Sequence, residues 1–275
     1  MKWVGLIAVL ICGSLLIYGT VDFPDWSDIS SPASRHVSPH YIEKTIPETS
    51  VPNIVTAVLA DYRGYDTLFE TVVIFTASMA CFFILRTKRK APEARLYRHT
   101  PTGITFRIEK GGKLPQKSPE FERIDSVWVP HDLIVKTTCR LVIPFIQLFA
   151  LYVIAHGHHS PGGGFQGGVI LGASLVLFAI SHTLREGINR MSEKIAFFFC
   201  SLGVFIYAGI GVLCLFLGKN FLDYSALASV LGVDPVSARS HGILGVEIGV
   251  GIAVMAAMVT IYYLLSSAGK QDEGL

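Results

Sequence analysis

Six long runs of apolar residues constrain this chain more than any other feature of its sequence. They cover residues 3–18, 68–85, 132–155, 165–184, 194–217 and 241–266, and each is near the roughly 20 residues that a helix needs to cross a bilayer. Apolar residues make up 51% of the 275 positions and charged residues only 16%, below the roughly 25% typical of soluble domains. The sequence therefore predicts an all-α integral membrane protein with about six transmembrane helices.

The first run, residues 3–18, follows a single lysine and is compatible with a secretory signal or with a first transmembrane helix. It is slightly longer than the core of a typical signal peptide, and no clear cleavage site with small residues follows it. These two observations favour an uncleaved helix.

A basic segment sets the orientation that we expect. Residues 86–123 contain eleven Lys or Arg and four Asp or Glu, which by the positive-inside rule is typical of a cytoplasmic segment. Residues 20–52 contain five prolines and five acidic residues, which indicates an external loop. Alternation of the spans then places both termini in the cytoplasm and residues 156–168 on the outer face.

The same segment divides the chain into three parts. We expect a two-helix module over residues 1–90, a basic cytoplasmic linker over 91–130 and a four-helix module over 131–275. No fixed-period repeat relates the two modules.

A glycine-rich turn connects the third and fourth apolar runs. Its thirteen residues, 156–168, include six glycines, three histidines and a glutamine. We expect a structural turn formed by Pro161, Gly162, Gly163, Gly164, Gln166, Gly167 and Gly168. The spacing of its glycines also satisfies the dinucleotide-binding fingerprint, but that motif requires a preceding strand and a following amphipathic helix. Apolar runs flank this turn, so nucleotide binding is not supported.

Ionisable residues within or beside the spans are the candidate functional groups, because charge is costly inside a bilayer. Glu247 lies in the last run among small residues that let another helix approach, so it is either an ion-carrying carboxylate or a structural one. Glu70 begins the second run, where Thr67 and Glu70 also match a helix capping box. Asp61 and Asp66 precede it, and Asp66 with Glu70 at i, i+4 would share a helix face.

The histidines of the turn, of which His156 and His158 are our candidates, favour proton passage over metal binding. Their ordinary pKa lies near neutrality, and no carboxylate or cysteine stands beside them at zinc-enzyme spacing. Lys136 and Arg140 are expected to reach the cytoplasmic interface, and His182 is either an interface residue or a proton relay. The five cysteines form no C-x-x-C pair, so we expect neither a metal site nor a resident cofactor.

The turn, His156-Gly-His-x-Ser-Pro-Gly-Gly-Gly-Phe-Gln-Gly-Gly168, strongly resembles the signature of the MnhB (MrpB) component of multisubunit Na⁺/H⁺ antiporters of the Mrp type. The resemblance covers roughly residues 132–266. A second element, Asp61-Tyr-Arg-Gly-Tyr-Asp-Thr-Leu-Phe-Glu70, is similar to the carboxy-terminal element of the large subunit of the same antiporters. A similar element also forms a small separate subunit of membrane-bound hydrogenase-type complexes.

The resemblance implies a membrane subunit of a cation/proton antiporter module, all-helical and without redox chemistry of its own. It implies Na⁺ and H⁺ as transported ions and other antiporter subunits as partners, with hydrogenase-type subunits as a second possibility. Its functional residues map onto Glu70, Asp66, His156 and the glycine turn, and less specifically onto Glu247. We therefore expect part of a transporter rather than an enzyme, in a prokaryotic cytoplasmic membrane and without a nucleic-acid partner.

The alternative is a structural scaffold, whose glycine faces dock partner helices and whose charges only cap helices or reach the interface. The sequence alone leaves open the cation, the direction of its movement, the stoichiometry, and whether the complex is a free-standing antiporter or is linked to a hydrogenase.

Overall fold

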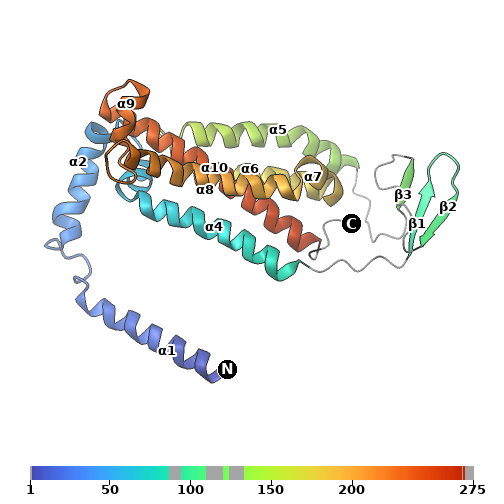
Figure 1. Cartoon of the computed structure of the whole chain (residues 1–275), viewed down its shortest axis with the longest axis horizontal. Coiled ribbons are helices and arrows are strands. Elements are labelled where there is room, and N and C mark those ends of the chain that lie inside the picture. Colours follow the sequence, from blue (N-terminus) through green and yellow to red (C-terminus); the bar gives the residue numbers. More distant parts are fainter. Residues whose placement is uncertain (1, 87–93, 110–119, 124–132, 268, 270–275) are drawn as a thin grey trace.

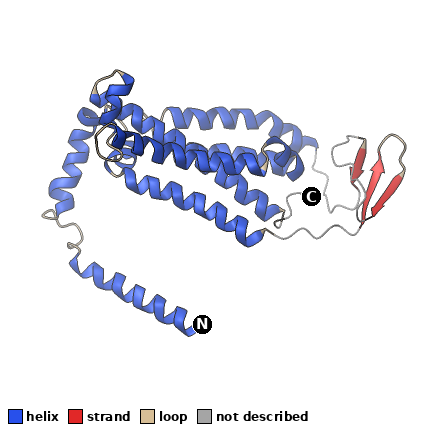
Figure 2. Ribbon diagram, in the orientation of Figure 1, coloured by secondary structure: helices blue, strands red, loops and turns tan. Residues whose placement is uncertain are grey.

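The computed structural model describes residues 2–86, 94–109, 120–123, 133–267 and 269. Within these residues, six helices are long and apolar enough to cross a membrane, and they confirm the predicted fold (Figures 1 and 2). They are α1 (Lys2–Gly19), α4 (Gly64–Leu85), α5 (Leu133–Ala155), α6 (Gly164–Ser181), α8 (Glu193–Phe216) and α10 (Pro235–Ser266).

Helix α10 forms the centre of the bundle. Of the most apolar part of this helix, 67% is buried inside the protein, a larger share than in any of the other five spans. Helices α4, α6 and α8 pack directly against it, and α5 lies against α6. Small residues make this packing close: Gly203 of α8 faces the backbone of Gly249, and Gly168 of α6 faces Gly251.

The ends of the helices follow local capping signals. Helix α10 begins six residues before the predicted apolar run, because the Asp234 side chain accepts a hydrogen bond from the backbone N–H of Ser237 and Pro235 occupies the first turn. Helix α6 ends at Ser181, and a separate helix α7 (Leu184–Arg190) starts after Thr183, whose hydroxyl caps it. A further short pair, η4 (Tyr224–Leu227) and α9 (Ala228–Leu231), precedes α10.

The polar segment 20–52 is not only a loop, and that prediction was wrong for its second half. After a 3-10 turn η1 (Thr20–Asp22), a π-helical turn η2 (Ala33–Val37) leads into helix α2 (Ser38–Thr49). Pro39 fits the first turn of α2, where its missing N–H has no helical partner, although Pro47 lies inside the helix. The prolines therefore did not exclude a helix here.

Two short elements connect α2 to α4, namely α3 (Ile54–Ala57) and the π-helical turn η3 (Val58–Tyr62). Because α4 begins at Gly64, Thr67 and Glu70 are already inside the helix, and Thr67 donates its hydroxyl to the Leu59 carbonyl at 2.8 Å. The predicted capping box is therefore absent at this helix start.

A small antiparallel sheet lies in the basic segment between α4 and α5. Its strands are β1 (Ala94–His99), β2 (Thr105–Glu109) and β3 (Phe121–Arg123), in the order β2-β1-β3. Tyr97 pairs with Phe106 on one side and with Arg123 on the other, and its side chain is buried. The expected linker thus contains strands, which its charge pattern did not indicate.

Helix α1 stands apart from the bundle (Figure 1). None of its apolar window is buried within this chain. The amino-terminal end of α1 and the carboxy-terminal ends of α4, α6 and α10 point towards the side on which the sheet lies, as Figure 1 shows. The glycine turn lies at the opposite end of the bundle, where α5 ends and α6 begins.

Candidate ion and proton site

A cavity of about 180 Å³ lies between the two predicted modules, and residues of both modules line it. Glu70 of α4 and Glu247 of α10 both line it, together with Gln166 and Tyr207. Thr56 and Thr67 contribute hydroxyl groups to the lining of this cavity. These polar groups stand among a largely apolar lining, and the space is large enough for several water molecules.

The two carboxylates mark different ends of this cavity. Glu247 is 8% exposed, whereas Glu70 is an exposed residue of α4. The cavity therefore leads from a carboxylate inside the protein to a carboxylate on the protein surface. This juxtaposition unites the two strongest sequence candidates, although 177 positions separate them along the chain.

The glycine turn surrounds the Glu247 carboxylate. A Cβ atom placed on Gly157 would lie 3.0 Å from Glu247 Oε2 and 3.3 Å from Oε1. A Cβ on Gly163 would overlap Oε1, and the backbone amide of Gly164 interacts with the carboxylate. The backbone of the glycine turn therefore packs directly against the Glu247 carboxylate.

Two positions explain why the turn needs glycine. Gly162 has a φ of +136°, which side chains disfavour, and a Cβ there would lie 2.8 Å from Val153 Cγ1. At Gly164 a Cβ would overlap the backbone carbonyl of Glu247. Glycine here allows α6 to meet α10 backbone to backbone at the level of the carboxylate.

The first module clamps this turn through α3. Asn53 donates its side-chain amide to the carbonyls of Gly157 and Ser160, both at 2.8 Å, and its backbone N–H to the His158 carbonyl at 2.9 Å. Thr56 donates its hydroxyl to the Gly157 carbonyl at 2.9 Å. The turn's backbone carbonyls are therefore held by the other module.

The histidines of the turn have different surroundings. His156 stacks on Tyr152, with ring centroids 4.9 Å apart, and also contacts His159. His158 packs inward: its Nδ1 lies 3.5 Å from the Ser240 hydroxyl, and its Nε2 is buried and has no hydrogen-bond partner among the residues that the structure describes. Burial lowers the pKa of His158, and the neighbouring His159 and His241 lower it further.

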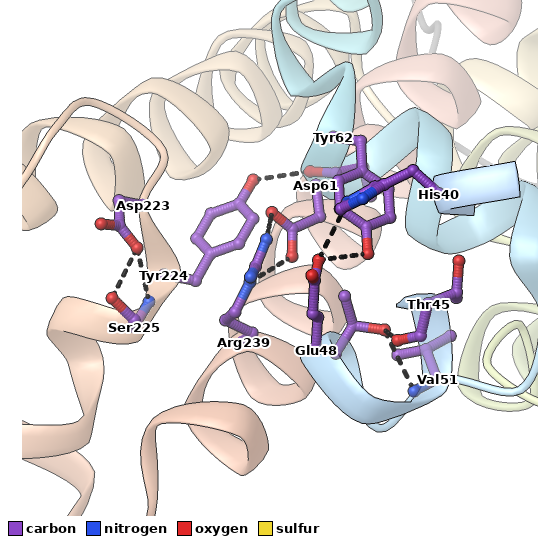
Figure 3. A network of polar contacts seen from close by, with 12 residues as sticks. His40, Thr45, Glu48, Val51, Asp61, Tyr62, Asp223, Tyr224, Ser225 and Arg239 are labelled. Atoms are coloured by element: carbon purple, nitrogen blue, oxygen red, sulfur yellow. Dashed lines mark hydrogen bonds and ion pairs between the residues drawn. The ribbon is translucent and has the colours of Figure 1, made fainter. Parts of the chain in front are cut away.

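Asp61 takes part in a separate polar cluster, shown in Figure 3. Its side chain is 5% exposed and accepts two hydrogen bonds from Arg239, at 2.7 and 2.9 Å. Burial raises the pKa of the Asp61 carboxyl, and the Arg239 guanidinium opposes this. The Asp61 carboxylate is thus paired with Arg239, and Asp61 is not among the described residues that line the cavity.

The same cluster extends to α2 (Figure 3). Tyr62 donates its hydroxyl to Glu48 at 2.7 Å, and His40 lies 3.4 Å from the same carboxylate oxygen. The Tyr62 hydroxyl lowers the pKa of Glu48, while burial and Glu48 raise the pKa of Tyr62 to about 12.

Asp66 and Glu70 do not form one site. Asp66 makes an ion pair with Arg63 three residues earlier, and both side chains are well exposed. Arg63 therefore compensates the negative charge of Asp66. Of the two acidic residues, Glu70 is the one that lines the cavity.

Two buried tyrosines fix η3 and the start of α4 against the second module. Tyr207 of α8 donates to the Gly64 carbonyl at 2.8 Å, and Tyr224 of η4 donates to the Ala60 carbonyl at 2.9 Å. These hydrogen bonds set the wall of the cavity, because Ala60 and Tyr207 line it.

The remaining turn residues have positional roles. Gly167 faces the backbone of Ala150 and Gly168 faces that of Gly251, so both mark helix crossings. Gln166 lines the cavity, and Pro161 is exposed just before the positive-φ glycine. In the described part of the chain, no group of three or more His, Cys, Asp or Glu side chains is arranged to hold a metal ion.

Sequence reasoning missed Asn53, Thr56, Tyr207, Tyr224 and Arg239. Their partners lie more than 100 residues away along the chain. The sequence offered one indication that Arg239 has a specific partner, because this residue is a charge within one turn of an apolar run. The uncharged residues carried none.

Comparison with known proteins finds two families along this chain. Residues 134–260 match a family described as a domain related to the MnhB subunit of Na⁺/H⁺ antiporters. Residues 5–99 match the MbhE family of MBH subunits.

Individual relatives match either most of this chain or about half of it. An uncharacterized protein of Methanocaldococcus jannaschii is 26% identical over 246 residues, with 87% of each chain covered. A probable K⁺/H⁺ antiporter A/B protein of Rhizobium meliloti is 25% identical over 92% of this chain and 24% of its own length. The putative antiporter protein MnhB2 of Staphylococcus aureus is 26% identical over 50% of this chain and 95% of its own.

Two solved structures share the fold. A chain of an archaeal membrane-bound sulfane sulfur reductase superposes with a TM-score of 0.54 at 23% identity, covering 94% of this chain and 97% of that one. A chain of the Mrp complex from Dietzia gives a TM-score of 0.50 at 20% identity, covering 93% of this chain and 25% of that one. This chain therefore carries a domain related to the MnhB subunit of Na⁺/H⁺ antiporters over residues 134–260, and residues 5–99 in front of it match the MbhE family.

Proposed function

We propose that this protein contributes a hydrated ion or proton path through the cavity between its two domains. The observation that carries this proposal is that Glu70 and Glu247, from different domains, line one cavity. In this path Glu247 holds the ion or proton inside the protein, and Glu70 exchanges it with a neighbouring subunit. The transported ions are protons and Na⁺ or K⁺, and conduction requires no bond chemistry beyond proton transfer.

The exposure of Glu70 supports a partner at this face. Glu70 lies nearly two turns inside an apolar helix, where a carboxylate facing lipid is costly. Neighbouring antiporter subunits would cover it and continue the path. The relatives named after antiporter subunits support such partners, and the likeness to a respiratory reductase chain makes a redox-linked complex the second context.

We further propose a prokaryotic cytoplasmic membrane as the location, with both termini and the β-sheet in the cytoplasm. The basic residues of segment 86–123 support this orientation. The bundle end that carries the glycine turn, η4 and α9 then faces outward.

The competing function is a scaffold without an ion path. The many glycine contacts between α6, α8 and α10 are what a scaffold requires. The buried Glu247 favours the path, because a scaffold gains nothing from a carboxylate oxygen that has no hydrogen-bond partner.

Glutamine variants separate the two functions. Gln has nearly the shape of Glu but does not titrate, so Glu70→Gln and Glu247→Gln should assemble normally. We expect each to lower cation/proton exchange about a hundredfold or more, because one positioned proton-transfer group typically contributes about 10²–10⁴-fold. The measurement is the pH gradient formed in proteoliposomes that contain the complex purified through a tag on this chain, with Na⁺ and K⁺ tested in turn.

Glu43→Gln serves as the matched control, because Glu43 is exposed on α2 and lies outside the cavity. It should exchange ions at the parental rate. Parental rates for both cavity variants, with normal subunit content, would instead establish the scaffold.

A further inference from the structure

Two buried polar side-chain atoms in the described part of the protein have no hydrogen-bond partner, namely His158 Nε2 and Glu247 Oε2. Such atoms are rare, because burying a polar atom without a partner costs about 1–3 kcal/mol. Both belong to titratable groups, and both lie beside the glycine turn.

The two groups lie along the same face of α10. His158 contacts Ser240 through Nδ1, and Ser240 precedes Glu247 by seven residues, which is close to two helical turns. The distance along the helix is therefore about 10 Å. Gly157, which precedes His158, faces Glu247 Oε2 directly.

The structure holds His158 in this place. Its carbonyl accepts the backbone N–H of Asn53, and the carbonyl before it accepts bonds from Asn53 and Thr56. The turn lies at the end of the bundle opposite the sheet (Figure 1). His158 thus stands between that end and the buried carboxylate.

We propose that His158 is the proton relay that connects the outer surface to Glu247. In each transfer one ring nitrogen gains a proton while the other gives one up, and Glu247 takes up the released proton through water. The incoming proton comes from a hydronium ion at the outer surface, so one O–H bond and one N–H bond break while one N–H bond and one O–H bond form. This inference rests on the proposed function, because the relay needs Glu247 to carry protons.

The surroundings of His158 suit a group that returns to the neutral state. The titratable groups that act on it are His159 in the turn and His241 on α10, while Asn53 and Thr56 of the first module bind the backbone carbonyls beside it. Burial and the two neighbouring histidines lower the pKa of His158, so the ring is neutral near pH 7 and has one nitrogen free to accept a proton.

The test uses the assembled complex in proteoliposomes. His158→Gln removes both ring nitrogens while keeping a polar side chain, and we expect it to lower exchange about a hundredfold. Added imidazole should restore at least half of the lost rate, and the acidic limb of the parental pH–rate profile should be missing. His158→Asn is carried in parallel as a smaller replacement in case the first variant assembles poorly.

His159→Gln is the matched control, because His159 is exposed in the same turn. It should keep the acidic limb of the parental pH–rate profile and the parental rate at the optimum, with the limb shifted to higher pH, because His159 lowers the pKa of His158. Parental exchange by the His158 variants at every pH would overturn the relay, and so would a loss in assembled complexes that imidazole does not restore. If Glu247→Gln alone abolishes exchange, the proposed function survives without the relay. If Glu247→Gln is also unaffected, both fail.

Discussion

At the scale of single residues, Asn53 connects the two domains through several hydrogen bonds of one side chain. Its side-chain amide satisfies two carbonyls of the glycine turn and the hydroxyl oxygen of Thr56, and its own oxygen caps α3 at Val55. A single polar side chain thereby ties the MbhE domain to the turn that surrounds Glu247.

Asn53→Ala should therefore weaken the contact between the domains. We expect a loss of about 1–3 kcal/mol, because the Ser160 carbonyl loses the amide and the Gly157 carbonyl keeps only the Thr56 hydroxyl as a side-chain donor. The midpoint of thermal unfolding of the purified complex should fall accordingly. Asn220→Ala is the control, since Asn220 is exposed and its backbone carbonyl is the group that bonds. Equal midpoints for the two variants would show that the side-chain hydrogen bonds of Asn53 contribute no stability.

At the scale of elements, glycine determines how closely the helices approach α10. In α8, a Cβ on Gly203 would overlap the Gly249 carbonyl, whereas a Cβ on Gly209 would meet nothing within 4 Å. The two positions share one helix and differ only in what faces them.

Alanine at these two positions should act in opposite directions. Gly203→Ala forces α8 away from α10, and we expect it to lower the thermal unfolding midpoint and to reduce the amount of assembled protein. Gly209→Ala should leave the midpoint unchanged or raise it, because Ala favours a helix by about 1 kcal/mol over Gly. A similar loss at both positions would mean that helix flexibility, and not close approach, is what these glycines provide.

At the scale of the whole molecule, the two domains form one unit around α10. Helices α4, α6 and α8 all pack on it, so the division seen in the sequence is not a division of the core. The same α10 supplies Glu247 to the cavity and Arg239 to the cluster with Asp61.

The orientation of this unit in the membrane is testable with reporters. Fusions at Gly103, in the turn between β1 and β2, and at Gly232, just after α9, should report opposite sides, with Gly103 in the cytoplasm. The physical reason is that basic residues resist translocation. Reporters that are active on the same side would exclude the six-span arrangement.

The sequence by itself determined the spans, their approximate ends, the importance of the glycine turn and the resemblance to antiporter subunits. These follow from local properties: the length of apolar runs, the position of charges and the spacing within a motif. Local reasoning failed where a charge or proline pattern was compatible with two structures, as in α2 and in the β-sheet. It also placed a capping box at Thr67, although the helix had already begun at Gly64.

Only the tertiary structure decided which acidic residues meet. It paired Asp61 with Arg239, paired Asp66 with Arg63, and brought Glu70 and Glu247 to one cavity. It also revealed Asn53 and Thr56 as partners of a turn more than 100 positions away. These pairings depend on the rotation and approach of packed helices, which are set by contacts between distant residues and leave no periodic signal in the sequence.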